Sequence, residues 1–532
     1  MTRVTSYAAA TRAAVRAARP PAPEAPRPRL SWRGWLAVLT VTAFGGLLRF
    51  WNLGRPSTLV FDETYYVKQG WSMIEAGYEL AWKGKGDEVD PLWNRGDTNV
   101  FLTTPDFVVH PPVGKWMIGL GEWIFGPTNP FGWRFASAVV GTLSILMIIL
   151  IARRLFGSTL LGLTAGLLLS VDGQHFVHSR TGLLDVFVMF WALAAFGCLL
   201  IDRDVGRRRL ALRAASEFAD REQVTTDSWS WWLGVRWWRL AGAVCLGLCA
   251  GTKWSGLYFA LVFGLMIVFW DMGARRAVGL RHWFAGSVLW NAVSGAAMLV
   301  VAFATYLLSW TGWFLSSDAY NRNWAAEHPG EGLTFLPSAL RSLAYYHQQM
   351  WEFNIDLDAT HPYEANPWSW IVLGRPTAFY YESAKAGERG CDVDACSQAI
   401  TALGNPLIWW GATLGIAVLL FHWALRRDWR AGAVLAGLTA GYLPWFQYQD
   451  RTIFNFYTVA FTPWVVLTVV YVLGLILGRT SDSARRRRNG AWIAGALVLL
   501  AVLCFWFFVP VYTAQLIPQP SWSDRMWLRS WI

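Results

Sequence analysis

Two adjacent carboxylates are the first residues in this sequence whose types could do chemistry. Asp62 and Glu63 lie among aromatic side chains, with Phe61 before them and Tyr65 and Tyr66 after them. A poorly solvated setting raises the pKa of a carboxyl group, so one of the pair could act as a general base. The alternative is an acidic first turn that complements a helix dipole. The dipeptide alone does not decide between these interpretations.

A second group of candidates consists of cations that could meet a phosphate. His110 and Lys115 belong to a His-Pro-Pro-Val-Gly-Lys run, and Arg134 follows in Gly-Trp-Arg. The two prolines fix a rigid turn ahead of an amphipathic segment, at the depth where a lipid phosphate would lie. Simple anchoring of the chain at the headgroups is the alternative.

Further charges interrupt the apolar runs that follow. Arg180 and Asp185 belong to a polar stretch between two such runs, and charges that enter a span are costly and usually functional. A solvated loop whose charges pair with one another is the alternative. Lys253 and Arg451 lie in turns between apolar runs, where an arginine is well suited to a phosphate.

A later long loop carries polar groups that could hold a sugar. Hydrogen bonds and stacking on the nearby tryptophans are the interactions expected there. The candidates are His347, Gln348, His361 and Tyr363. Each of them is also an ordinary feature of a membrane interface.

The elements that must position these residues are apolar helices in a membrane. The chain has 532 residues, of which 55% are hydrophobic and 15% charged, whereas soluble domains carry roughly 25% charged residues. Its 36 tryptophans crowd the ends of the apolar runs, at the headgroup level. The net charge of +11 comes from short basic clusters between those runs, so we expect membrane lipid and no nucleic acid as a partner.

About 20 apolar residues make one crossing, and on this basis the sequence predicts an all-α polytopic protein with about eleven spans. These lie near 34–51, 134–152, 158–174, 182–201, 238–253, 255–272, 283–310, 404–424, 431–446, 453–477 and 490–510. Arginine clusters fall in alternate connections, so the positive-inside rule places the N-terminus in the cytoplasm. We expect a disordered cytoplasmic tail over 1–33 and an extracytoplasmic tail over 513–532.

Two outward connections, 52–133 and 311–403, are long and more acidic than basic, and we expect function there. Helical spacing in the first predicts helices that lie in the interface. In the second, Cys391 and Cys396 bracket a polar turn in an oxidising location, which predicts a disulfide-closed hairpin. The turn spells Asp-Val-Asp, as in metal-dependent transferases, but a polar turn is the favoured interpretation.

Taken in order, these motifs resemble those of the protein O-mannosyltransferase family of GT-C glycosyltransferases. They are Asp-Glu, His-Pro-Pro-Val-Gly-Lys, Trp-Arg-Phe-Ala-Ser-Ala, Ser-Arg with Leu-Leu-Asp, Gly-Thr-Lys-Trp-Ser-Gly, and His-Pro-Tyr with Pro-Trp-Ser-Trp. The resemblance runs from about Leu36 to Tyr512. It implies a GT-C catalytic module over 34–310, an extracytoplasmic loop over 311–403 and a four-helix region over 404–512.

The resemblance also implies the reaction. The donor would be polyprenyl-phosphate mannose, the acceptor a Ser or Thr hydroxyl on a translocated protein, and the anomeric carbon would be inverted. Asp62 would be the base, and Glu63 would orient the acceptor or tune the pKa of Asp62. Arginine and lysine can meet the charge of a lipid monophosphate, so we expect no metal and no cofactor.

The departures from the family pattern point to a compact, bacterial form in the cell membrane. The second long loop is too short for the β-trefoil insertion of eukaryotic members, and Val-Gly replaces the more usual Leu-Ala before Lys115. Acceptor proteins, polyprenyl length, oligomeric state and coupling to a translocon stay open.

Three other functions compete with this one. A related GT-C enzyme could move another sugar, such as aminoarabinose, to a lipid acceptor. A transporter is the alternative of a different class, and the odd number of spans and the lack of inverted repeats count against it. An oligosaccharyltransferase is disfavoured because no large soluble domain follows the last predicted span.

Overall fold

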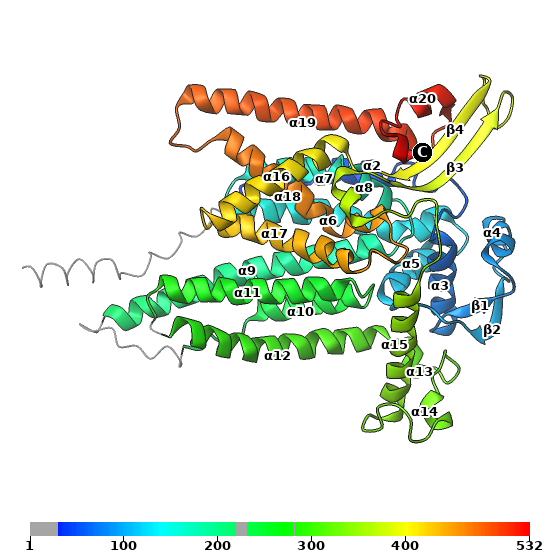
Figure 1. The fold of residues 1–532 in the computed structure, drawn as a ribbon, viewed down its shortest axis with the longest axis horizontal. Coiled ribbons are helices and arrows are strands. Elements are labelled where there is room, and N and C mark those ends of the chain that lie inside the picture. The colour runs from blue at the N-terminus through cyan, green and yellow to red at the C-terminus, as the bar shows by residue number, and fades with distance from the viewer. Residues whose placement is uncertain (1–29, 220–230, 281) are drawn as a thin grey trace, which may run out of the picture.

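The computed structural model describes residues 30–219, 231–280 and 282–532. The expected cytoplasmic tail over 1–33 therefore lies almost entirely outside the described residues. The described chain is mostly helical, and short strands and helices gather at one end of a long bundle, the right-hand end in Figure 1. We call this the loop-rich end.

A helix occupies every predicted span. These helices are α2 (Trp32–Phe50), α6 (Pro130–Phe156), α7 (Thr159–Ser170), α9 (Asp185–Ala219), α10 (Trp237–Ala250), α11 (Gly256–Ala277), α12 (Trp283–Ser309), α16 (Pro406–Ala424), α17 (Trp429–Tyr442), α18 (Thr462–Leu477) and α19 (Ala484–Tyr512). Within the described ranges, seven helical stretches are long and apolar enough to cross a membrane, and α7 and α10 are apolar but shorter. The prediction of an all-α polytopic fold is confirmed.

Local sequence explains where several of these helices begin. Asn129 caps α6, since its side chain accepts a hydrogen bond from the Phe131 N–H, and Pro130 follows in the first turn. Asn405 and Pro406 start α16 in the same way. Such caps satisfy N–H groups that have no partner inside the helix, and proline there loses nothing.

The first long connection folds as three helices with a two-stranded sheet. Its elements are α3 (Glu63–Ala76), β1 (Leu80–Trp82), α4 (Gly86–Asn94), β2 (Phe101–Pro105) and α5 (Val113–Phe125). Helices α3 and α5 pack closely because glycines meet there: a Cβ on Gly119 would lie 2.6 Å from the Gly70 carbonyl oxygen. This contact fixes α3, which carries the Asp-Glu pair, against the neighbouring helix.

The second long connection contains one long helix and a β-hairpin. Its elements are α13 (Thr311–Leu315), α14 (Trp324–Glu327), α15 (Ser338–Asp356), η2 (Pro367–Val372), β3 (Thr377–Lys385) and β4 (Ala395–Ala402). Cys391 and Cys396 are disulfide-bonded at the tip of the antiparallel β3–β4 hairpin. In Figure 1, α15 stands across the axis of the bundle.

The last residues of the chain fold back onto this connection. Strand β5 (Ile517–Pro518) pairs with β4, and α20 (Gln519–Ser523) and η5 (Arg529–Trp531) follow it. The Trp531 indole N–H donates to the Leu373 carbonyl oxygen at 2.6 Å. The other short helices are α8 (Gly173–His178), η3 (Leu443–Gln447) and η4 (Asn455–Phe461).

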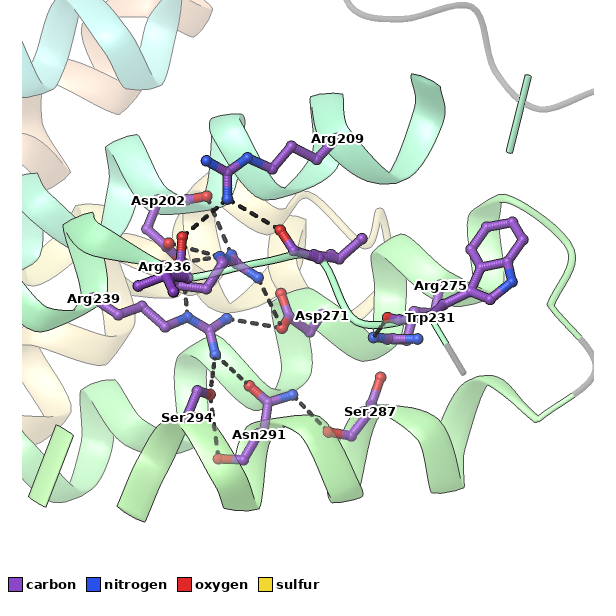
Figure 2. A network of polar contacts seen from close by, with 12 residues as sticks. Asp202, Arg209, Trp231, Arg236, Arg239, Asp271, Arg275, Ser287, Asn291 and Ser294 are labelled. Atoms are coloured by element: carbon purple, nitrogen blue, oxygen red, sulfur yellow. Dashed lines mark hydrogen bonds and ion pairs between the residues drawn. The ribbon is translucent and has the colours of Figure 1, made fainter. Parts of the chain in front are cut away.

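A buried polar network, which the sequence does not predict, joins four helices away from the loop-rich end (Figure 2). Arg239 of α10 donates to Asp202 of α9, Asp271 of α11 and Asn291 of α12, each at 2.8 Å. Arg236 also binds Asp202, at 2.8 Å through Nε. Arg239 is 2% exposed, so the network connects the four helices α9, α10, α11 and α12 inside the bundle.

Candidate functional site

A pocket of about 710 Å³ lies among the loops that join the helices. One face of α3 forms part of its wall, with Asp62, Tyr65, Tyr66 and Gln69. Their spacing of three, one and three residues is that of a single helix face. The helical pattern of the first long connection could have identified this wall from the sequence.

Asp62 is the carboxylate at the start of this face. It is the residue before the first turn of α3 and makes no side-chain capping bond. Burial raises the pKa of Asp62 to about 7; the nearby Lys253 opposes this shift and Asp185 adds to it. Asp62 is therefore partly ionised near neutral pH and can accept a proton.

Glu63 points away from the pocket into the protein. It is fully buried and forms a two-point ion pair with Arg134, with N–O distances of 2.8 Å. Its carboxylate also accepts from the Gly182 N–H at 2.8 Å and the Val60 N–H at 3.0 Å. These contacts place Glu63 to hold the start of α3.

Arg134 and Arg180, both predicted to bind phosphate, lie outside the pocket lining and bind groups inside the protein. Arg134 adds hydrogen bonds to the Pro56 and Thr58 carbonyl oxygens. Arg180 binds carbonyls at the end of α2, including that of Trp51 at 2.6 Å. Carbonyl oxygens and phosphate oxygens attract guanidinium groups alike, so the sequence could not separate the two roles.

Lys115 also has an internal partner. It is buried, forms an ion pair with Glu79 and donates to the His110 carbonyl oxygen at 2.8 Å. The His110 ring itself lines the pocket. Burial, together with Lys253 and Lys115, holds the pKa of His110 well below its usual value, so the ring is neutral.

Two cations do line the pocket, Lys253 and Arg451. The Lys253 ammonium lies 3.1 Å from the Asp185 carboxylate and 4.4 Å from the centre of the Tyr457 ring. Within the described residues, Nε of Arg451 is buried without a hydrogen-bond partner. Asp185 is therefore outside the pocket lining and is connected to the pocket by its ion pair with Lys253.

The sugar-binding candidates of the second connection lie outside the lining as well. His347 bonds to the Tyr306 hydroxyl at 2.5 Å, which attaches α15 to α12. Gln348 donates to Glu352 at the surface. The His361 ring packs against Phe454, and Tyr363 lies under Arg375.

The pocket also has an apolar wall, which no motif in the sequence predicted. Leu257 of α11 and Trp351, Phe353 and Ile355 of α15 line it, and each is 44–54% exposed. Exposed apolar side chains on a single wall suit an apolar ligand. The signal available in the sequence was the set of Trp351, Phe353 and Ile355, which alternate with polar residues at the end of α15.

Comparisons with known proteins agree with the motifs. Residues 38–309 match the family described as dolichyl-phosphate-mannose-protein mannosyltransferase. Residues 339–531 match the C-terminal four-transmembrane-helix region of protein O-mannosyltransferase.

Curated relatives resemble the chain over nearly its whole length. The polyprenol-phosphate-mannose–protein mannosyltransferase of Mycolicibacterium smegmatis is 37% identical, over 94% of this chain and 93% of that protein. The protein of the same name from Corynebacterium glutamicum is 32% identical, over 96% of each.

A solved structure shares the fold. The S. cerevisiae protein O-mannosyltransferase Pmt1-Pmt2 complex bound to the sugar donor superposes with a TM-score of 0.71, over 95% of this chain and 93% of that chain. The identity is 14%, so this likeness concerns the fold alone. The family matches and the near full-length relatives together show that this multi-span membrane protein belongs to the protein O-mannosyltransferase family of GT-C glycosyltransferases.

Proposed function

We propose that the protein transfers mannose from polyprenyl-phosphate mannose to Ser or Thr hydroxyls of proteins. The observation that carries this proposal is the pocket, which combines a carboxylate of raised pKa, two cations and an apolar wall. The relatives named for this donor and for protein acceptors support the same substrates.

Asp62 is the general base in this proposal. A Ser or Thr hydroxyl is a weak nucleophile at neutral pH, and removing its proton as it attacks C1 of the sugar makes it effective. The new C1–oxygen bond forms while the bond from C1 to the phosphate oxygen breaks. A single displacement of this kind inverts the anomeric carbon.

Lys253 and Arg451 meet the leaving phosphate. The lipid monophosphate gains charge as it departs, and fixed cations in a site shielded from water stabilise that charge. This scheme requires no divalent ion. The Asp-Val-Asp turn, Asp392 to Asp394, belongs to the disulfide-closed hairpin and is not among the residues that line the pocket.

Glu63, Arg134 and Asp185 act by holding the residues that line the pocket. The Glu63–Arg134 pair holds the start of α3 and so fixes Asp62. Asp185 holds the Lys253 ammonium, whose charge in turn lowers the pKa of Asp62. These are positioning residues.

The apolar wall suits the polyprenyl chain of the donor. Leu257 and Trp351 are about half exposed on this wall, and α11 continues from Leu257 as an apolar span. A lipid tail that stays in the bilayer while its phosphate enters the pocket fits such a wall.

We place the pocket on the extracytoplasmic face of the cell membrane, with the N-terminus in the cytoplasm. The positive-inside rule supports this orientation, because arginines cluster at the ends of α6, α11 and α16 and at the start of α19. The bacterial relatives support the cell membrane as the location.

A transfer assay with the purified protein tests the proposal. The protein is incubated with polyprenyl-phosphate mannose and a Thr-rich peptide, and mass spectrometry should detect peptide that gained one hexose. A parallel reaction with polyprenyl-phosphate aminoarabinose and a lipid acceptor tests the rival GT-C reaction. Product in the second reaction alone would refute the proposed function.

A further inference from the structure

Asp106 is a second carboxylate in the pocket, and the proposed transfer does not use it. It follows β2, and its backbone N–H donates to the Glu79 carbonyl oxygen at 2.9 Å. Among the described residues it forms no ion pair, because the nearby Lys115 is paired with Glu79. Its unpaired, partly buried charge would gain from a cationic ligand.

The surroundings of Asp106 reinforce this need for a cation. Burial and the Glu79 carboxylate raise the pKa of Asp106, against the opposing effects of the Phe107 N–H and Lys115. A positive group next to Asp106 would favour its charged form and remove part of the cost of its burial.

Asp106 lies along the pocket from the proposed base. The pocket face of α3 runs from Asp62 to Gln69, seven residues or ~10 Å. The next residue, Gly70, packs against the carbonyl of Lys115, whose side chain reaches Glu79 beside Asp106. An extended peptide covers ~10 Å in about three residues.

The two long connections at the loop-rich end carry a net negative charge, as Asp106 does. The connections 52–129 and 311–403 contain 21 acidic and 11 basic residues, whereas the full chain contains 35 acidic and 46 basic. The end that carries the pocket is therefore acidic in a basic protein. Such a field attracts positively charged segments and repels negative ones.

We propose that Asp106 selects acceptor segments that carry Lys or Arg within about three residues of the target Ser or Thr. The inference rests on the proposed function, since it names a preference of the same site. The cationic side chain pairs with Asp106 while the hydroxyl lies at Asp62.

Three peptides with a single Thr test this preference. They differ only at the second residue on each side of the Thr, which is Lys, Gln or Glu. We expect the wild type to favour the Lys peptide over the Gln peptide by about tenfold in kcat/KM, the worth of one partly shielded ion pair. Asp106→Asn should abolish this preference and leave the Gln peptide unchanged.

Two further variants sharpen the test. Asp97→Asn removes the same charge from the same connection, but Asp97 is exposed and outside the pocket lining, so the Lys preference should persist. Asp106→Lys should reverse the preference and favour the Glu peptide over the Lys peptide.

Several results would overturn the inference. They are equal use of the three peptides by the wild type, a Lys preference that survives in Asp106→Asn, and an equal loss on all three peptides in that variant. Absence of transfer to any peptide by the wild type would instead refute the proposed function, and the inference with it.

Discussion

The pKa of Asp62 gives a directional prediction at the scale of single residues. Because burial raises this pKa to about 7, the fraction of Asp62 that can accept a proton grows as the pH rises through 7. Turnover should therefore fall about tenfold for each pH unit below about 6.5 and level off above about 7.5. A profile of kcat between pH 5 and 9 measures this, and a flat profile from pH 5 upward would contradict the assignment.

Arg134 and Arg451 should behave differently when each is replaced by Ala. Arg134→Ala leaves Glu63 buried without its partner and should cost about 3–5 kcal/mol of stability, seen as a lower Tm. Arg451→Ala should keep the Tm but raise the donor KM and lower kcat, since its target charge grows in the transition state. Normal stability with weak donor binding in Arg134→Ala would restore the phosphate role to Arg134.

Some of the residues predicted for the site line the pocket and others lie outside it, for one physical reason. Asp62, His110, Lys253 and Arg451 were predicted, and each lines the pocket. Arg180 was predicted by the same logic yet binds the carbonyls that end α2. What a cation contacts depends on tertiary packing, which the sequence leaves undetermined.

At the scale of elements, the spans were predictable because apolar length has to match the thickness of the bilayer. The strands β1 and β2 were not, since three to five residues carry too little periodicity. The polar stretch after α7 proved to contain the short helix α8, capped by Asp172, which accepts from the His175 N–H.

The network around Arg239 makes a prediction about the helices that it joins. Arg239→Met should lower stability by about 3–5 kcal/mol, because Asp202 and Asp271 lose a buried partner. Arg209→Met is the matched control: this side chain is exposed and, among the described residues, binds the Leu233 and Val235 carbonyls, so its loss should cost about 1 kcal/mol. The Tm of each variant is measured in the same detergent. An equal decrease in Tm for both variants would show that the network does not stabilise the helix bundle.

At the scale of the whole molecule, the distribution of charge predicts the topology. Ser481→Cys precedes α19 beside its arginine cluster, and Ser523→Cys ends α20 at the loop-rich end. With the N-terminus in the cytoplasm, an impermeant thiol reagent should label intact cells at 523 and not at 481. Both should react in permeabilised cells, and the reverse pattern in intact cells would invert the proposed orientation.

The central claim is that this pocket transfers mannose with Asp62 as the base, and one paired measurement tests it most directly. Turnover with polyprenyl-phosphate mannose and a Thr peptide is measured for the wild type and Asp62→Asn, together with donor affinity, with and without a chelator. We predict a loss of about 10²–10⁴ in turnover for the variant, nearly unchanged donor binding, and no effect of the chelator. Near-wild-type turnover in Asp62→Asn, or a wild type that the chelator stops, would contradict this account.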